Sequence, residues 1–389
     1  MIEEGDLKGR LRLLRAAAFL STFDRFTAAP MLVTIAVGLG ASLEEVAWSA
    51  SLYYLLYGAM QPVWGTLSDR LGRVRVIRLA LVGVLVPGLV SALAPNLATL
   101  VVGRALAGGL FAAVIPASLV YIGDTVPMNV RQRALADQLA TSAVATALAT
   151  GTAGVTAYLG LWRVAFAVPV LASAALGLFL LSRLPEPERE VGAGPLARLG
   201  IAVRKPWAGL VVTLALIEGG VILGFLTYLA PALESVGYSA AVSGLVVGLY
   251  GLATLGWTRV LRLVSGRLGR HVLLLVGGAL LALGYAAGAL GQNLVGISIA
   301  ACLVGGGFAF MHSTLQTWAT EVVPEARATV ISFFAAALFV GSGVATTAAA
   351  PLAEAGSFAT LFALAAVAAV PLALLAGFAR LRYDAGKKP

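Results

Sequence analysis

The sequence predicts an all-α integral membrane protein with twelve transmembrane helices, arranged as two parallel, pseudo-symmetric halves of six helices each. Three observations support this fold class. Hydrophobic residues make up 60% of the 389 residues, and the mean hydropathy is +0.94. Apolar runs of about 20 residues, which is the length that crosses a bilayer, recur from end to end. An internal repeat divides the chain near its middle.

The apolar runs define the predicted spans in chain order, with charged or turn-forming residues between them. The spans are 13–39, 46–67, 76–94, 97–123, 134–160, 163–182, 207–233, 240–263, 271–291, 294–320, 327–352 and 357–380. Only 12% of the residues are charged, and no polar stretch is long enough for a separate soluble domain. We therefore expect one unit embedded in the lipid bilayer.

The basic residues predict the orientation of these spans. Lys and Arg number 27 against 18 Asp and Glu, which gives a net charge of +9. The short linkers 42–45, 95–96 and 291–293 contain no Lys or Arg, whereas the intervening linkers do. Since basic residues collect on cytoplasmic loops, we expect both termini on the cytoplasmic side of the inner (cytoplasmic) membrane. With no soluble basic face, the positive charge does not indicate nucleic-acid binding.

The division into halves rests on a linker and a repeat. Residues 184–206 are rich in Pro and Gly and form the predicted cytoplasmic linker between the N-terminal half, 1–183, and the C-terminal half, 207–389. Several short motifs recur at a spacing of 197 residues. These are Arg70-Leu71-Gly72-Arg73 with Arg267-Leu268-Gly269-Arg270, Gly108-Gly109 with Gly305-Gly306, and Asp124 and Pro127 with Glu321 and Pro324. Six spans separate the copies, so the halves are parallel, as in one known transporter architecture.

The segment from Gly65 to Arg73, Gly-Thr-Leu-Ser-Asp-Arg-Leu-Gly-Arg, resembles the signature of the major facilitator superfamily between spans two and three. Gly103-Arg104-Ala105-Leu106-Ala107-Gly108 resembles the family's fourth-span motif. The resemblance implies secondary transport by alternating access, and the twelve-helix drug–proton antiporter branch is the part of the family it is most similar to. It also implies a conformational latch between the halves on the cytoplasmic side. The latch residues are Gly65, Asp69, Arg70, Gly72, Arg73, Asp124, Arg131, Glu321 and Arg327.

Two departures from the family pattern bear on this expectation. In the second copy of the signature, Gly266 stands at the position of Asp69, so we expect a one-sided latch in which Asp69 meets the span that begins near Arg327. The family's antiporter motif in span five contains a proline, and the matching segment Gly151-Thr152-Ala153-Gly154 lacks it. Antiport, symport and uniport therefore all remain open.

Charged residues inside spans are the candidate site, because ionisable groups in the hydrocarbon region are costly and usually functional. Asp24 lies eleven residues into the first span, roughly 16 Å deep at about 1.5 Å per residue. Its neighbour Arg25 cannot share its helix face, so the two have different partners. The resemblance implies that Arg104 in span four takes part in proton coupling with Asp24 as its partner. The alternative is that these charges only stabilise the fold.

The C-terminal half adds two candidates. Glu218 lies eleven residues into span seven among apolar neighbours, where it could bind and release a proton or remain a protonated core residue. His312 in span ten is a weaker candidate, since a lone histidine is more often a packing residue. Together with Asp24, Arg25 and Arg104, these residues are the predicted site for protons and a small-molecule substrate.

The sequence favours proton-coupled efflux of hydrophobic or amphipathic compounds, with proton-coupled transport of a specific metabolite, such as a sugar or organic anion, as the alternative. A membrane-embedded enzyme would need more than the two histidines present. ATP-driven pumping is excluded because no lysine lies in a phosphate-binding loop. A channel fits the parallel repeat poorly. With one cysteine, Cys302, neither an intramolecular disulfide nor a Cys-rich metal site forms. We expect a monomer without cofactor or metal.

Overall fold

The computed structural model describes residues 4–180, 183–187 and 204–386. Every regular element in these ranges is helical. The N-terminal half contains α1 (Glu4–Thr27), η1 (Ala29–Met31), α2 (Leu32–Leu39), α3 (Leu43–Leu71), α4 (Arg73–Gly83), α5 (Leu85–Ala92), α6 (Leu97–Phe111), α7 (Val114–Thr125), α8 (Met128–Tyr158), α9 (Trp162–Ala175) and η2 (Leu176–Leu180). The C-terminal half contains α11 (Pro206–Gly219), η4 (Gly220–Gly224), α12 (Leu229–Glu234), α13 (Ala240–Val264), α14 (Arg270–Leu290), α15 (Leu294–Gly307), η5 (Phe308–His312), α16 (Ser313–Glu321), η6 (Pro324–Ala326), α17 (Arg327–Glu354) and α18 (Phe358–Ala385).

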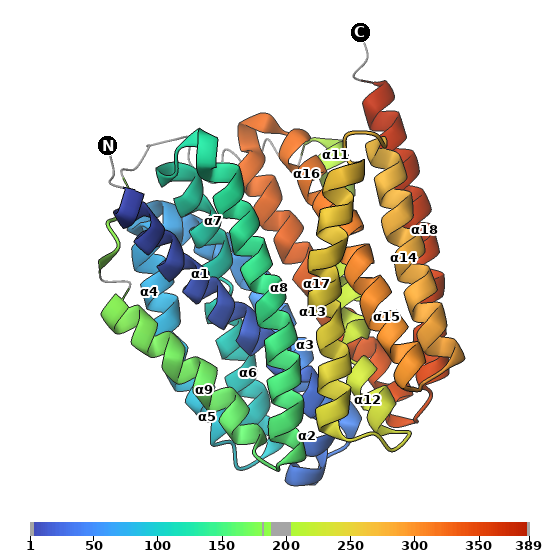
Figure 1. Ribbon diagram of the computed structural model, residues 1–389. Helices are drawn as coiled ribbons and strands as arrows, with labels where there is room; N and C mark the ends of the chain where they lie inside the picture. Colours follow the sequence, from blue (N-terminus) through green and yellow to red (C-terminus); the bar gives the residue numbers. More distant parts are fainter. Residues whose placement is uncertain (1–3, 181–182, 188–203, 387–389) are drawn as a thin grey trace.

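These helices lie roughly side by side and form two bundles, one from each half of the chain (Figure 1). The start of α1 and the end of α18 lie at the same end of the molecule, here called the terminal face; the other end is the opposite face (Figure 1). Within the described ranges, ten helical segments are long and apolar enough to cross a membrane. The remaining two of the twelve spans are α1 to α2 and the helix α3, which contain more charged residues. The predicted all-α, twelve-helix fold is confirmed.

Several spans are interrupted helices, which the apolar runs did not show. The first span breaks between α1 and α2 at η1, which contains Pro30. The seventh and tenth spans contain the π-helical turns η4 and η5. Such turns are rare and occur frequently at functional sites. Helix ends also shift: α1 begins at Glu4 and α8 at Met128, both earlier than the predicted starts of their spans.

The repeat extends to the residues that cap the helices. Ser42 accepts a hydrogen bond from a backbone N–H at the start of α3, as Ser239 does at the start of α13. Asn96 and Asn293 cap α6 and α15 in the same way. Each pair of caps is 197 residues apart in the sequence, as are the motifs. A capping side chain satisfies an N–H that the helix leaves unpaired, so these residues fix where equivalent spans begin.

The two halves meet along α3 with α17 and along α8 with α13. Gly154 and Gly244 face each other where α8 crosses α13, and a Cβ on Gly154 would lie 2.9 Å from the Gly244 Cα. A Cβ on Gly58 of α3 would similarly lie 2.7 Å from a backbone oxygen of α17. Glycine permits this close approach of helix backbones, as small residues commonly do between membrane helices.

One carboxylate also joins the halves at the opposite face. Glu354, the last residue of α17, accepts hydrogen bonds through Oε2 from the backbone N–H groups of Leu43 and Glu44, at 2.6 Å and 3.2 Å. These N–H groups belong to the first turn of α3. A carboxylate there satisfies unpaired donors and interacts favourably with the helix dipole.

Most of the predicted linker, residues 188–203, lies outside the described residues. Its beginning packs against the N-terminal half, where Glu186 accepts hydrogen bonds from the backbone N–H groups of Val74 and Arg75 at 3.1 Å and 3.2 Å. Gly72 has a φ of 110°, and a Cβ there would overlap the carboxylate of Glu186. The signature glycine is therefore required by both backbone conformation and space.

Candidate functional site

A buried ion pair joins the first and fourth spans. Arg104 Nη1 lies 3.0 Å from both carboxylate oxygens of Asp24, and Arg104 Nη2 donates to the Asp24 backbone oxygen at 3.0 Å. The side chains of Asp24 and Arg104 are 0% and 1% exposed. The guanidinium also lies over the rings of Tyr53 and Phe166. Since an unpaired charge in the membrane interior is costly, each member of the pair allows the other to lie there.

Arg25, the next residue of α1, has different surroundings. Its Cζ lies 5.4 Å, 5.3 Å and 5.1 Å from the ring centroids of Phe26, Tyr57 and Phe339. Its Nη2 lies 3.4 Å from Thr22 Oγ1, and its Nε is buried without a hydrogen-bond partner. Within the described ranges, no carboxylate forms an ion pair with Arg25.

The C-terminal half places Glu218 beside His312. Glu218 Oε2 lies 3.4 Å from His312 Nδ1, with side-chain exposures of 0% and 14%. The other carboxylate oxygen, Oε1, is buried without a hydrogen-bond partner. Glu218 lies two residues before the start of the π-turn η4, and His312 is the last residue of the π-turn η5. Two of the three π-turns in the described ranges, η4 and η5, therefore lie at the members of this pair, and the third is η2.

Aromatic rings from both halves connect Arg25 to His312. The ring centroid of Phe26 lies 6.2 Å from that of Tyr250, which lies 6.2 Å from that of Phe308. Phe308 stacks on His312 at 4.6 Å with an interplanar angle of 8°. We call these rings and their neighbours on α3 and α17 the aromatic site: Phe26, Tyr57, Tyr250, Phe308, Phe334 and Phe339.

Ion pairs at the terminal face follow the sequence repeat. In the N-terminal half, Arg73 lies 2.6 Å from Asp69 and 3.4 Å from Asp124. In the C-terminal half, the equivalent Arg270 lies 2.6 Å from Glu321. All three of these arginine–carboxylate pairs join the start of one span to the end of another within a half.

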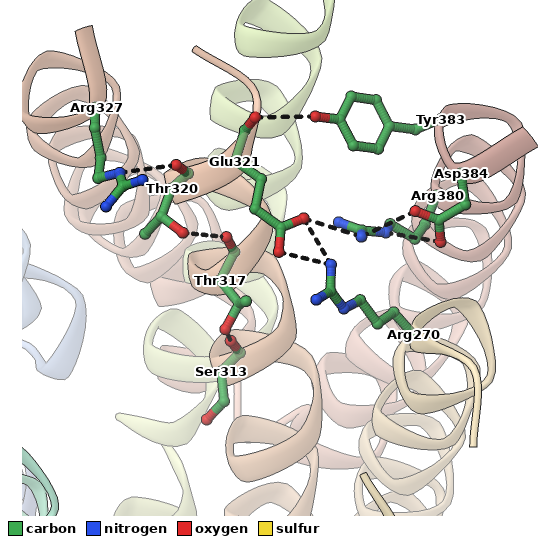
Figure 2. Close-up of polar contacts among 9 residues, drawn as sticks. All are labelled: Arg270, Ser313, Thr317, Thr320, Glu321, Arg327, Arg380, Tyr383 and Asp384. Atoms are coloured by element: carbon green, nitrogen blue, oxygen red, sulfur yellow. Dashed lines mark hydrogen bonds and ion pairs between the residues drawn. The ribbon is translucent and has the colours of Figure 1, made fainter. Parts of the chain in front are cut away.

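The C-terminal network is larger than its N-terminal counterpart. Figure 2 shows Glu321 between Arg270 and Arg380, whose Nη2 lies 3.0 Å from Glu321 Oε2. Arg380 also pairs with Asp384 at 3.0 Å, and Tyr383 donates through its hydroxyl to the Glu321 backbone oxygen at 3.0 Å (Figure 2). The network ties α14, α16 and α18 together.

The other predicted latch residues lie at the same face. Arg327 donates through Nε to the Thr320 backbone oxygen at 3.1 Å, as Figure 2 shows, and Arg131 donates to the Val126 oxygen at 3.0 Å. Arg70 is exposed at the end of α3. Gly65 lies within α3, where a Cβ would be 3.4 Å from Ser332 Oγ on α17. Asp69 pairs with Arg73 of its own half rather than with the α17 start near Arg327.

Sequence reasoning missed Glu186, Glu354 and Arg380. Glu186 and Glu354 cap helices that lie more than a hundred residues away, and no local pattern marks them. Arg380 and Asp384 are four residues apart, a spacing that signals an ion pair on a helix. Within the described part of the chain, no group of three or more His, Cys, Asp or Glu side chains could hold a metal ion.

The sequence relatives include a transporter and an exporter, and each matches over a short stretch. The "Triacylglyceride transporter" of Mycolicibacterium smegmatis is 31% identical over 111 residues, 28% of this chain and 20% of the relative. The "Dehydrocurvularin exporter" of Alternaria cinerariae is 29% identical over 198 residues, 47% and 32% of the two chains. The "Fatty acid resistance protein FarB" of Neisseria gonorrhoeae is 30% identical over 135 residues, 35% and 27%. Each match spans less than a third of the relative's length.

Solved transporters share the fold over nearly the whole chain. A D-xylose–proton symporter has a TM-score of 0.74 at 17% identity and covers 93% of this chain and 96% of its own. The nucleoside transporter NupG has a TM-score of 0.77 at 14% identity, with coverages of 95% and 99%. Residues 15–346 also match the family description Major Facilitator Superfamily. Since that match covers most of the chain, the protein belongs to the Major Facilitator Superfamily and is a multi-pass membrane transporter rather than an enzyme.

Proposed function

We propose that the protein is a secondary active transporter that couples the entry of protons to the efflux of hydrophobic or amphipathic compounds. The observation that supports this most directly is the Glu218–His312 pair beside the aromatic site. Glu218 is fully buried, and its Oε1 has no hydrogen-bond partner. A proton can therefore bind there without breaking an existing contact. The rings around the pair suit an apolar substrate.

The coupling follows from where the pair lies. The aromatic site beside it contains rings from both halves, for example Phe26 and Tyr250. Movement of the N-terminal half, 1–183, relative to the C-terminal half, 207–389, changes these contacts and exposes the site to one side of the membrane at a time. A proton on Glu218 removes the negative charge of its carboxylate. The protonated and deprotonated proteins can then favour different conformations, which couples proton binding to the movement of the halves. A proton on Asp24 would break its ion pair with Arg104, so this pair is a second candidate for proton coupling.

The remaining expectations complete the proposal. The terminal face is the cytoplasmic side of the inner membrane, since Lys and Arg collect there. The signature loop and its partners form the latch that closes this side, with Asp69 exchanging Arg73 for the N-terminal end of α17. The protein works as a monomer, because each half contributes one wall of a single site.

The names of relatives support a hydrophobic substrate. One is a triacylglyceride transporter, one an exporter and one a fatty acid resistance protein. The test is transport by purified protein in proteoliposomes with an imposed pH gradient and a panel of labelled compounds. Gradient-dependent export of apolar compounds supports the proposal. Equal fluxes with and without the gradient contradict it.

The second candidate is proton-coupled transport of a specific metabolite, such as a sugar or organic anion. Polar atoms near the first span favour it: Tyr53 Oη and Arg104 Nε are buried and lack hydrogen-bond partners within the described ranges. A polar substrate would satisfy both. The same panel separates the candidates, since a metabolite transporter would move one polar compound and ignore apolar ones.

A further inference from the structure

Arg25 is a partly buried cation that has no acidic partner among the residues that the structure describes. Its acidic neighbour Asp24 is held by Arg104 through both carboxylate oxygens. Among the described residues, the buried Nε of Arg25 has no hydrogen-bond acceptor, and the contact from Nη2 to Thr22 Oγ1 is long, at 3.4 Å. A guanidinium has five N–H donors, so this single protein contact leaves others for a ligand. In the membrane interior such a group needs a compensating charge.

Aromatic rings compensate Arg25 in part. The rings of Phe26, Tyr57 and Phe339 lie within 5.4 Å of its Cζ, measured to their centroids. The face of a ring attracts a cation, but it accepts none of the in-plane N–H groups. A planar anion such as a carboxylate matches the edge of the guanidinium with two parallel hydrogen bonds.

The groups next to Arg25 define the rest of the ligand. Tyr57 and Phe339 come from α3 and α17, which belong to opposite halves, and their rings lie 4.2 Å apart. Both are buried, and Tyr54 stacks near them. A ligand whose anionic group reaches Arg25 must therefore place its remaining surface against apolar rings. A hydrophilic anion would leave its other polar groups without partners there.

We propose that Arg25 binds the anionic group of an amphipathic substrate whose apolar part lies in the aromatic site. The inference rests on the proposed function and specifies its substrate class. The neutral or cationic analogue of the same size binds less well, because it leaves Arg25 uncompensated.

Equilibrium binding tests the proposal without any gradient. The probes are dodecanoate, dodecanol and dodecyltrimethylammonium, which share an alkyl chain and differ in charge. Binding to purified protein in lipid nanodiscs is measured with empty nanodiscs subtracted. We expect the wild type to prefer dodecanoate over dodecanol by about tenfold. Arg25→Gln should abolish the preference, and Arg25→Lys should retain part of it.

Arg163→Gln is the matched control. Arg163 also lies over an aromatic ring, that of Trp162 at 4.1 Å, but it sits outside the aromatic site. This variant should keep the wild-type preference. Dodecanol binding shows whether Arg25→Gln still folds, since that probe does not need the charge.

Two outcomes would overturn the proposal. One is an unchanged preference for dodecanoate in Arg25→Gln, and the other is a wild type that binds all three probes equally. Failure of the proposed function looks different: the wild type would still prefer dodecanoate in nanodiscs, but a pH gradient would drive no export from proteoliposomes.

Discussion

The two halves of the molecule have the same scaffold and different chemistry. Residues that shape the scaffold recur at the spacing of 197: a Cβ on Gly108 would overlap the Tyr53 backbone oxygen, and one on Gly305 would meet the equivalent oxygen of Tyr250 at 2.6 Å. The membrane charges do not recur. The positions equivalent to Asp24 and Arg104 are Val221 and Ala301, and the position equivalent to Glu218 is Ser21. Symmetry is therefore kept where helices pack and in the ion pairs of the terminal face, and it is lost among the charges inside the membrane.

The charged pairs also differ in how completely they are satisfied. In the N-terminal half, Asp24 receives several contacts from one guanidinium. In the C-terminal half, Glu218 has one partner at 3.4 Å and a free oxygen. The carboxylate of the first pair is therefore more completely satisfied than that of the second, and the proposed function places proton binding at the second.

The largest effect should come from breaking the N-terminal pair. Asp24→Ala leaves Arg104 as an uncompensated buried charge, which costs about 3–5 kcal/mol. We expect a corresponding loss in the free energy of unfolding, measured by denaturation in detergent micelles. Arg104→Ala should cost a similar amount, and the double variant should cost less than the sum. Strictly additive costs would show that the pair contributes no stability.

Glu218→Gln should change transport more than stability. The amide keeps the shape of the side chain but cannot ionise, so export driven by the pH gradient should fall about a hundredfold or more, the lower end of what one proton-transfer group contributes to a rate. Thermal stability should change little. Glu234→Gln is the matched control, because Glu234 is another carboxylate of the same span with a buried, unpartnered oxygen. A gradient-driven flux equal to that of the wild type would remove Glu218 from the coupling site.

Removing the cap at the opposite face should have a smaller effect. Glu354→Gln weakens the contact that the C-terminal half makes with the start of α3, at a cost of about 1 kcal/mol. The population open at the opposite face should rise several-fold. Spin labels at Tyr158 and Val236, which are exposed near that face, report the change as a longer distance. Glu325→Gln, at the other end of the same span, should leave the distance unchanged.

The smallest effect is expected at the proposed latch. Asp69→Asn removes a helix-end attraction of about 0.3–1 kcal/mol and should favour the state that is open at the terminal face. Gly266→Asp places a carboxylate at the equivalent position of the other half and should do less. Labels at Met128 and Leu263, both exposed at the terminal face, measure the distance between the halves. The latch is ruled out if neither variant alters that distance distribution.

Hydropathy predicted most of the fold because a bilayer requires about 20 apolar residues per helix. The predicted span 240–263 matches α13, Ala240–Val264, and 271–291 matches α14, Arg270–Leu290. The break at η1 and the π-turns were not predicted from hydropathy, which averages over a whole span. Pro30 is the signal that could have shown the break at η1.

The sequence predicted one of the two contacts between candidate residues and missed the other. The cost of burying a charge singled out Asp24 and Glu218. The family resemblance added Arg104 as the partner of Asp24, and the structure places these two in contact. The contact between Glu218 and His312 joins residues 94 positions apart, so no local spacing could indicate it. The cap formed by Glu354 was missed for the same reason, and the chain around it resembles an ordinary helix end.

The close backbone contacts between α8 and α13 divide α8 into two unequal ends. They run from Ala143, opposite Gly251, to Gly154, opposite Gly244. Between Met128 and Ala143, α8 extends about 22 Å toward the terminal face, at about 1.5 Å per residue. A rotation of α8 by about 10° about this contact region would displace its terminal end by about 4 Å and the short end beyond Gly154 by about 1 Å.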